Sequence, residues 1–427
     1  MNKKLIGLGL ALAANGAFAQ STSGGSSIEI YGLIDIGVGY VQHSLNIDPN
    51  FQYGVNPLSS TKTSVSNSVS GMFNGGLSDS RWGLRGTEDL GGGMKAFFTL
   101  EQGFNAPNGS VNSSAASLAT NSTPLSVSGN SSLNGQMFNR QSFVGLSSTD
   151  FGSIQFGRNY TFLYDVVTQY DSLNAADVFS PFGSGTYGGG GGISEDVRVD
   201  NSIKYKNKIG AVNFGGFYKF GGTSGSTSAQ SAYGFNVGYE DGPFGIQAAV
   251  QNFTDALKGG VSTIAGDVNV TNYNTSSYLI AAKYNFGDAT VKGGYESYTL
   301  KAPSDAFATL GVGSYAGYVI GNATAASANF SKANQTTDIW YISGDYNFSP
   351  ALNLALGYYD VNLKASGDLG QNDGNQYYYS ALLDYKFSKR TDTYAGVMYV
   401  KFDGPQFPST TTNQNNEIFA VGLRHKF

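Results

Sequence analysis

The chain has 427 residues and no cysteine, and only 13% of its residues are charged, whereas an average soluble domain has about 25%. Its formal net charge of −5 argues against a nucleic-acid partner, and without cysteine its stability cannot come from disulfides. With two histidines in all, His43 and His425, a Ser/His/Asp triad or a histidine metal cluster is hard to assemble, so we expect neither an enzyme nor a metal or other cofactor.

The N-terminus has the three parts of a secretory signal peptide. Lys3 and Lys4 give a basic start, residues 5–14 are apolar, and Ala17 and Ala19 form a small-x-small end. The apolar run is shorter than the ~20 residues that a transmembrane helix needs. We therefore expect cleavage after Ala19, with a signal peptide over residues 1–19 and an exported domain over residues 20–427.

Period-two alternation recurs through most of the remaining chain and predicts strands with one apolar face and one wet face. In residues 27–42 the isoleucines fall on even positions while Glu29 and Asp35 fall on odd ones, and residues 244–253 and 376–387 repeat the pattern. About sixteen strands are expected by this reading. They begin near residues 28, 80, 94, 137, 151, 198, 211, 231, 244, 275, 289, 336, 351, 376, 391 and 416.

The connections between these strands alternate in length. Short turns rich in Gly, Asp, Asn or Pro take turns with long Ser/Thr/Asn/Gly segments at residues 43–79, 104–135, 255–273 and 301–333. An even number of strands with this alternation is typical of an outer-membrane barrel. A β-solenoid would show a fixed repeat of about 20 to 50 residues, which is absent, and a soluble sandwich leaves the many Tyr and Phe at strand ends unexplained. The sequence therefore predicts an all-β fold, a transmembrane antiparallel β-barrel.

Four blocks of sequence then follow one another in a familiar order, at residues 28–38, 80–104, 138–160 and 419–427. They resemble the general diffusion porins of Gram-negative outer membranes, most closely the type common in β-proteobacteria. The resemblance implies a 16-stranded homotrimeric barrel in the lipid and lipopolysaccharide of the outer membrane, with a third long loop folded inward to narrow the pore. It also implies passive diffusion of ions and small hydrophilic solutes. A substrate-specific channel for a sugar or an amino acid remains the alternative, because the same wall could bind such a solute.

The last strand ends in an aromatic residue, Phe427. Alternate residues before it are mostly apolar, namely His425, Leu423, Val421 and Phe419. In proteins that this chain resembles, such an ending is recognised by the barrel assembly machinery, so we expect Phe427 to be an assembly signal. It can equally well complete the lipid-facing side of the strand.

Parity assigns the charges of the second strand to the lumen. If Trp82 and Leu84 face lipid, then Arg81 and Arg85 face water, because an arginine near the bilayer midplane costs about 2 to 4 kcal/mol. Arg85 lies nearer the short turn and is the more doubtful member of a constriction.

Three more arginines are expected on the same wall: Arg140, Arg158 and Arg198. Strict alternation would put Arg158 on the lipid side with Phe156, but a bulge at Gly157 would shift the phase by one. The resemblance also places this arginine in the lumen. The simpler reading is that all of these are solvated wall charges without a specific role.

Residues 159–197 lose the alternation. Phe162, Val166 and Tyr170 lie at helical spacing, and the later part is rich in glycine. Irregular backbone can lie at membrane depth where it lines a water-filled cavity, so this segment is predicted to be the constriction loop. Its acids would then oppose the arginines: Asp165, Asp171, Asp177, Glu195 and Asp196. Opposed charges set ion preference in a pore, but the overall negative charge leans toward cations and the clustered arginines toward anions, so the sequence leaves the selectivity open.

Overall fold

The computed structural model describes most of the chain. The described residues are 26–45, 65–109, 111, 137–184, 197–222, 227–228, 231–259, 268–301, 314–315, 318–319, 335–365, 374–403 and 415–427. The predicted signal peptide, Glu195 and Asp196 lie outside them.

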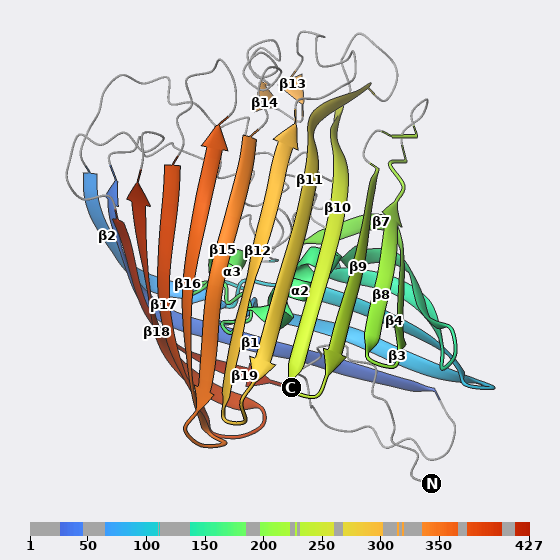
Figure 1. Ribbon diagram of the computed structural model, residues 1–427, viewed down its shortest axis with the longest axis horizontal. Helices are drawn as coiled ribbons and strands as arrows, with labels where there is room; N and C mark the ends of the chain where they lie inside the picture. Colours follow the sequence, from blue (N-terminus) through green and yellow to red (C-terminus); the bar gives the residue numbers. More distant parts are fainter. Residues whose placement is uncertain are drawn as a thin grey trace.

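Seventeen strands form one antiparallel sheet that closes on itself, since β19 pairs with β1 (Figure 1). They are β1 (Ser27–Leu45), β2 (Val65–Asn74), β3 (Arg81–Gly91), β4 (Met94–Gly103), β5 (Gln141–Ser148), β6 (Gly152–Tyr160), β7 (Arg198–Ile209), β8 (Val212–Lys219), β9 (Ala232–Asp241), β10 (Phe244–Gly259), β11 (Val268–Asn285), β12 (Ala289–Lys301), β15 (Gln335–Asn347), β16 (Leu352–Ala365), β17 (Gly374–Lys386), β18 (Thr391–Asp403) and β19 (Asn415–Lys426). A separate small hairpin joins β13 (Ser314–Tyr315) to β14 (Tyr318–Val319).

Two of these strands share one position in the wall. β3 pairs with the first part of β1, from Ser27 to Leu33, and β2 pairs with the later part, from Ile36 to Leu45. β2 and β3 are therefore two pieces of a single barrel strand, and the described barrel is 16-stranded, as predicted.

The strand positions predicted from alternation are confirmed, and short turns join neighbouring strands at the lower end of the barrel in Figure 1. Two of the loops are shorter than the sequence predicted. β1 ends within residues 43–79 and β2 lies wholly within them, so β2 was not predicted, while β10 and β11 extend into residues 255–273. β2 and the start of β11 are rich in Ser, Thr and Asn, which weakens the alternation on which the prediction depended.

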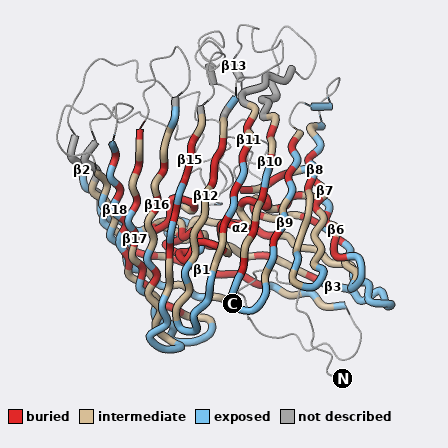
Figure 2. The backbone as a smooth tube through the Cα atoms, in the orientation of Figure 1, coloured by how far each residue is buried: buried red, intermediate tan, exposed pale blue. Residues whose placement is uncertain are grey.

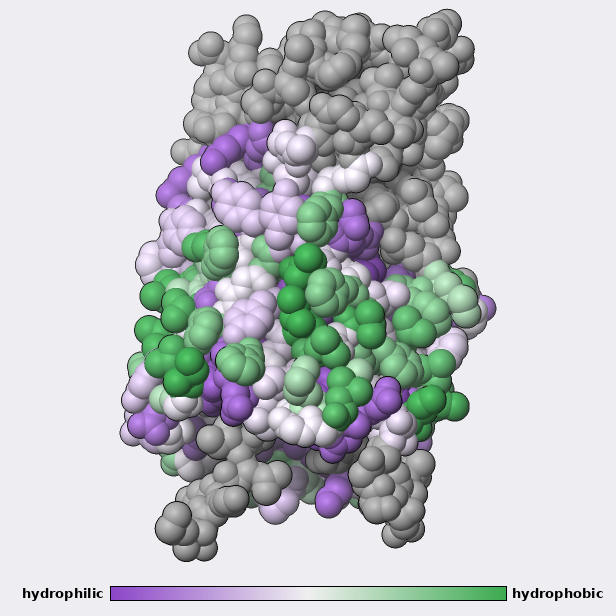
Figure 3. Space-filling model, turned by 90° about the vertical axis from the view of Figure 1, so that its right-hand side faces the viewer, coloured by the Kyte–Doolittle hydropathy of each residue, from purple (hydrophilic) through white to green (hydrophobic). Residues whose placement is uncertain are grey.

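The outer face of the wall is apolar. On β1, Ile28 and Ile30 are 65% and 66% exposed, whereas Tyr31 and Leu33, which follow at odd positions, are buried inside. Figure 3 shows the result on one side of the molecule, a belt of hydrophobic side chains with hydrophilic ones above and below. Aromatic pairs such as Tyr346 with Phe348 lie beside the short turns, as expected for an interfacial girdle.

The barrel interior holds two short helices, α2 (Phe162–Tyr170) and α3 (Pro181–Ser184), which lie at mid-height (Figure 1). Thr161 caps α2 by accepting the N–H of Tyr164 on its side-chain oxygen. The predicted helical spacing is confirmed, because Phe162, Val166 and Tyr170 all lie on the buried face of α2. No helix within the described ranges is long and apolar enough to cross a membrane.

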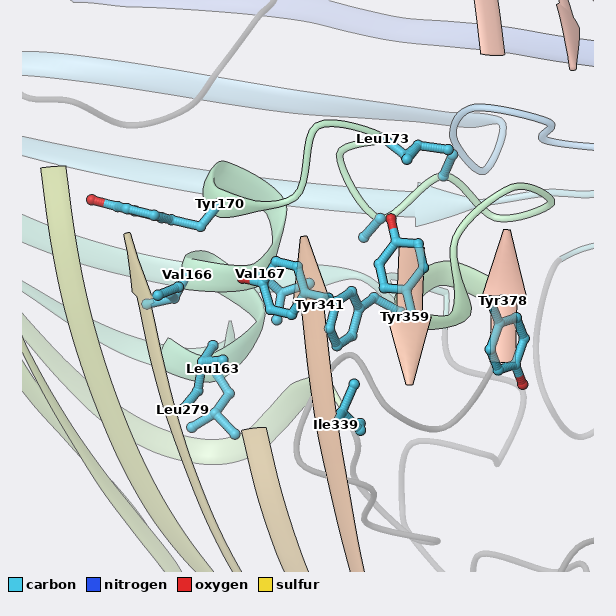
Figure 4. Packing of buried hydrophobic residues seen from close by; sticks show 14 of the residues in the cluster. Leu163, Val166, Val167, Tyr170, Leu173, Leu279, Ile339, Tyr341, Tyr359 and Tyr378 are labelled. Carbon is cyan, nitrogen blue, oxygen red and sulfur yellow. The ribbon is translucent and has the colours of Figure 1, made fainter. Parts of the chain in front are cut away.

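The loop that carries α2 and α3 packs against one part of the inner wall. α2 contacts β9 to β12, and buried residues concentrate around it (Figure 2). The wall contributes inward-facing apolar side chains, among them Leu279, Ile339, Tyr341, Tyr359 and Tyr378, which surround Leu163, Val166, Val167 and Leu173 of the loop (Figure 4). Burying a side chain of this size stabilises by about 1.5 to 3 kcal/mol, so the loop is fastened to the wall mainly by apolar packing.

Candidate functional site

The arginines predicted from parity do gather on the inner face of the wall. Arg140, just before β5, is buried and donates from Nε to Oε1 of Glu101 at 2.9 Å and from Nη1 to Oδ2 of Asp79 at 2.8 Å. Arg81 reaches the other oxygen of Glu101 less closely, at 3.7 Å. Glu101 also accepts the hydroxyl of Tyr31 at 2.9 Å. Glu101 is therefore shared by two guanidinium groups and holds this part of the wall together.

Arg158 reaches the lumen through the predicted bulge. The register of β6 against β7 shifts between Gly157 and Asn159, and Gly157 has a φ of +134° that favours glycine. The shift turns Arg158 inward, where it pairs with Asp200 and donates from Nε to the carbonyl oxygen of Asn139 at 2.7 Å. The bulge is thus what brings this arginine to the wall.

Arg198 lies against an aromatic pair. Its guanidinium is 5.2 Å from the centre of the Tyr160 ring, that of Arg140 is 5.9 Å from the same ring, and Tyr160 stacks on Tyr164 at 4.9 Å. Within the described part of the chain, Nε of Arg198 has no hydrogen-bond partner. Arg198 and Arg81 are therefore less closely bound to carboxylates than Arg140 and Arg158, which are committed to the wall.

Arg85 is engaged elsewhere. It forms two parallel bonds to Glu29, at 2.9 and 2.8 Å, and lies 4.9 Å from the ring centre of Tyr31. Along β3, Arg85 lies four positions after Arg81 and about 13 Å nearer to the short turn.

Of the predicted acids, Asp165 faces lysines. Its Oδ2 accepts from Nζ of Lys204 at 2.7 Å and of Lys206 at 2.6 Å. Burial opposes ionisation of Asp165, but the two ammonium groups outweigh it and lower the pKa of this carboxyl. Neither lysine was among the predicted site residues. The parity rule used for Arg81 would have identified them, because Lys204 and Lys206 lie on the opposite face of β7 from Ile203.

Asp171 requires a correction, because it is completely buried rather than exposed to the lumen. Its oxygens accept the hydroxyl of Tyr359 at 2.6 Å, the hydroxyl of Ser180 at 2.8 Å, and the N–H groups of Leu173 and Ala175. A carboxylate with this many donors is satisfied within the protein, so Asp171 fastens the loop to β16.

Asp177 is the loop acid that the structure places near the arginine wall. Burial and the neighbouring carboxylate of Asp79 raise its pKa well above the usual range, although Arg140 and Arg81 oppose the shift. In the described residues its Oδ2 has no hydrogen-bond partner. The positions of Glu195 and Asp196 stay predictions.

Phe427 ends the wall beside the first strand. Its backbone N–H and carbonyl exchange hydrogen bonds with Gly32 at 3.0 and 3.1 Å. A Cβ on Gly32 would lie 2.5 Å from the Phe427 ring, so the ring occupies the space that a larger residue would need.

Comparison with known proteins agrees with this architecture. A family model described as Gram-negative porin matches residues 8–405. An outer membrane porin protein of Bordetella pertussis is 27% identical and covers 98% of this chain and 99% of its own length. Outer membrane porin protein 32 of Delftia acidovorans is 30% identical over 69% of this chain and 68% of its own. Among solved structures, an anion-selective porin from Comamonas acidovorans superposes with a TM-score of 0.63 at 23% identity, covering 94% of this chain and 100% of that one.

Proposed function

This chain belongs to the Gram-negative porin family, and we propose that the constriction of its channel favours small anions. As an outer membrane porin it forms a water-filled barrel for the diffusion of ions and small hydrophilic solutes, a channel rather than an enzyme. The anion preference is the step that the site supports beyond the family.

The observation that carries the proposal is the incomplete pairing of the arginine wall. Four guanidinium groups face three carboxylates, those of Glu101, Asp79 and Asp200, so the arginines exceed these partners by one charge. Asp177 lies near them, but burial and the carboxylate of Asp79 raise its pKa and so disfavour its charged form. Fixed charges at the narrowest point set ion preference. The name of the Comamonas relative, an anion-selective porin, supports the same direction.

The test is the reversal potential of the reconstituted channel in a salt gradient. Arg198→Gln is expected to shift the selectivity toward cations. Arg85→Gln is the matched control, since Arg85 is about 13 Å along β3 from Arg81, which exceeds the Debye length of about 8 Å at physiological salt. A cation-selective wild type, or equal shifts from both variants, would contradict the proposal.

A substrate-specific channel is the second candidate, and the stacked pair of Tyr160 and Tyr164 beside Arg198 favours it, because a planar solute could lie on an aromatic face next to a cation. Such a channel would show saturable flux of one sugar or amino acid and a block of ion current by that solute. Flux that rises linearly with concentration for every small solute would leave general diffusion as the function.

The assembly partners are part of the proposal as well. We propose a homotrimer surrounded by lipid and lipopolysaccharide, with Phe427 read by the barrel assembly machinery. Deleting Phe427 is expected to lower the amount of trimer in the outer membrane while leaving the conductance of assembled trimers unchanged.

A further inference from the structure

The barrel strand made of β2 and β3 is interrupted inside the wall. β2 ends at Asn74 and β3 begins at Arg81, and residues 75–80 between them leave the sheet. They cover Asp35 of β1, which is completely buried and points into the barrel, because its neighbour Ile34 is exposed on the outer face. Residues 75–80, here named the inward segment, therefore lie on the lumen side of the wall.

Asp35 holds the inward segment through its carboxylate. Oδ2 accepts the N–H groups of Leu77 at 2.9 Å and Ser78 at 3.0 Å. Oδ1 accepts the N–H of Gly76 at 3.3 Å and the hydroxyl of Tyr394 at 2.6 Å. Four hydrogen bonds converge on this one carboxylate, so it is a main point of attachment for the inward segment.

The backbone of Asp35 adds to the attachment at both ends of the segment. Its carbonyl accepts the N–H of Gly75 at 2.9 Å, and its N–H donates to the hydroxyl of Ser80 at 3.0 Å. Gly75 has a φ of +70°, and a Cβ there would lie 2.8 Å from Oδ2 of Asp177. Glycine is thus required where the inward segment meets the constriction loop.

The inward segment in turn contacts both parts of the constriction. Asp79 pairs with Arg140 of the arginine wall at 2.8 Å. The carbonyl of Gly76 accepts the N–H of Val178 in the constriction loop at 3.2 Å. The segment thus connects the β1 wall, the arginines and the loop at one level of the barrel.

We propose that the inward segment is a second constriction element, and that Asp35 and Tyr394 are positioning residues that hold the Asp79 carboxylate against Arg140. Held there, Asp79 cancels part of the arginine charge and limits the anion preference of the channel. The inference deepens the proposed function, because it rests on the arginine wall as the selectivity filter.

Tyr394→Phe gives the cleanest test, since it removes one hydroxyl and changes no charge. Release of the inward segment is expected to carry Asp79 away from Arg140, which shifts the reversal potential toward anions and raises single-channel conductance. Asp79→Asn is expected to give the selectivity shift with little change in conductance. In the double variant Tyr394→Phe should add no further shift in reversal potential to that of Asp79→Asn, because the charge it would move is already gone. Additive shifts would overturn the proposal.

The movement of the segment is measured separately with a thiol probe. The chain has no cysteine, and Leu77 is 9% exposed, so Leu77→Cys supplies a single protected thiol on the inward segment. Adding Tyr394→Phe is expected to speed its modification by a small hydrophilic methanethiosulfonate at least about tenfold, because the hydroxyl makes two hydrogen bonds, donating to Asp35 and accepting the N–H of Gly76. Asp35→Asn should speed it further, provided that electrophoresis shows intact trimers.

The two measurements separate the possible failures. An unchanged modification rate in assembled Tyr394→Phe trimers overturns the role of Tyr394 in holding the segment. A faster rate without a shift in reversal potential overturns the role of the segment in selectivity. If Arg198→Gln left the reversal potential unchanged, the proposed anion filter would fail, whereas the thiol result would still stand for the attachment.

Discussion

The inner wall of the barrel has two unlike halves at the level of the constriction. The charged half, carried by β3 to β7, presents Arg81, Arg140 and Arg158 with their carboxylate partners, and Arg198 beside the Tyr160 ring. The covered half, carried by β10 to β18, presents buried aliphatic and aromatic side chains against the constriction loop (Figure 4). Apolar burial holds the loop on one half and leaves the charges of the other half to meet water. We therefore expect the asymmetry, rather than the loop alone, to set the selectivity of the proposed filter.

A charge placed in the covered half is expected to have the largest effect on the channel. Leu163 of α2 is completely buried beside Leu279. Leu163→Asp buries an unpaired carboxylate, which costs about 3 to 5 kcal/mol, so the loop is expected to detach from the wall and single-channel conductance to rise severalfold. Asn174→Asp, an exposed position on the same loop, is the matched control and should leave conductance near that of the wild type. Equal conductance in both variants would show that apolar packing does not hold the loop.

Asp171 is expected to give a smaller effect of the same kind. Asp171→Asn weakens the attachment to Tyr359 and leaves a buried amide among N–H donors, at a cost of about 1 to 3 kcal/mol. We expect noisier single-channel currents and higher mean conductance, with little change in reversal potential, because this carboxylate does not face the lumen. A shift in selectivity as large as that of Arg198→Gln would instead return Asp171 to the filter.

Asp165 lies at the boundary between the two halves, where α2 meets β7. Asp165→Asn leaves Lys204 and Lys206 without their carboxylate, so the reversal potential should shift toward anions. Because the pKa of Asp165 is lowered, the wild-type group stays ionised through the neutral and mildly acidic range, and the difference between the proteins should persist there. The shift should shrink as salt shortens the Debye length from about 10 Å at 0.1 M to about 3 Å at 1 M. A shift toward cations would rule out this assignment.

The smallest expected effect is a pH step that depends on Asp177. Its raised pKa means that the group is neutral below that pKa and negative above it, so the anion preference should fall as the pH rises through it. Asp177→Asn should keep the low-pH reversal potential at higher pH, whereas Asp150→Asn, at an exposed turn between β5 and β6, should titrate like the wild type. If the reversal potential of Asp177→Asn changed with pH in the same way as that of the wild type, Asp177 would not be the group responsible for the step.

The sequence predicted what depends on local alternation. Alternation located most of the strands, helical spacing located α2, and a break in the alternation located the bulge at Gly157. Parity also placed Arg81 on the wet side of the wall, whereas Arg158 required the bulge and the resemblance in addition.

The rest of the site depends on contacts between residues far apart in the chain. Asp171 was predicted as a filter acid because it lies on the loop, but Tyr359, which is 188 residues away, takes up its carboxylate. Asp79 was not selected, since its segment reads as part of a polar loop until β2 and β3 are seen to share one position beside β1. Which acid meets which arginine is decided by the closed barrel, and no local pattern encodes it.

The bond between Asp35 and Tyr394 also implies an order of events during folding. Asp35 lies in β1 and Tyr394 in β18, 359 residues apart, and they meet only when β19 has paired with β1. Bringing such distant residues together has a large entropic cost that must be met before the contact forms. The inward segment therefore reaches its final position at the last step of barrel closure. The carboxylate of Asp79, which the inward segment carries, therefore reaches Arg140 only once the seam between the two chain ends is sealed.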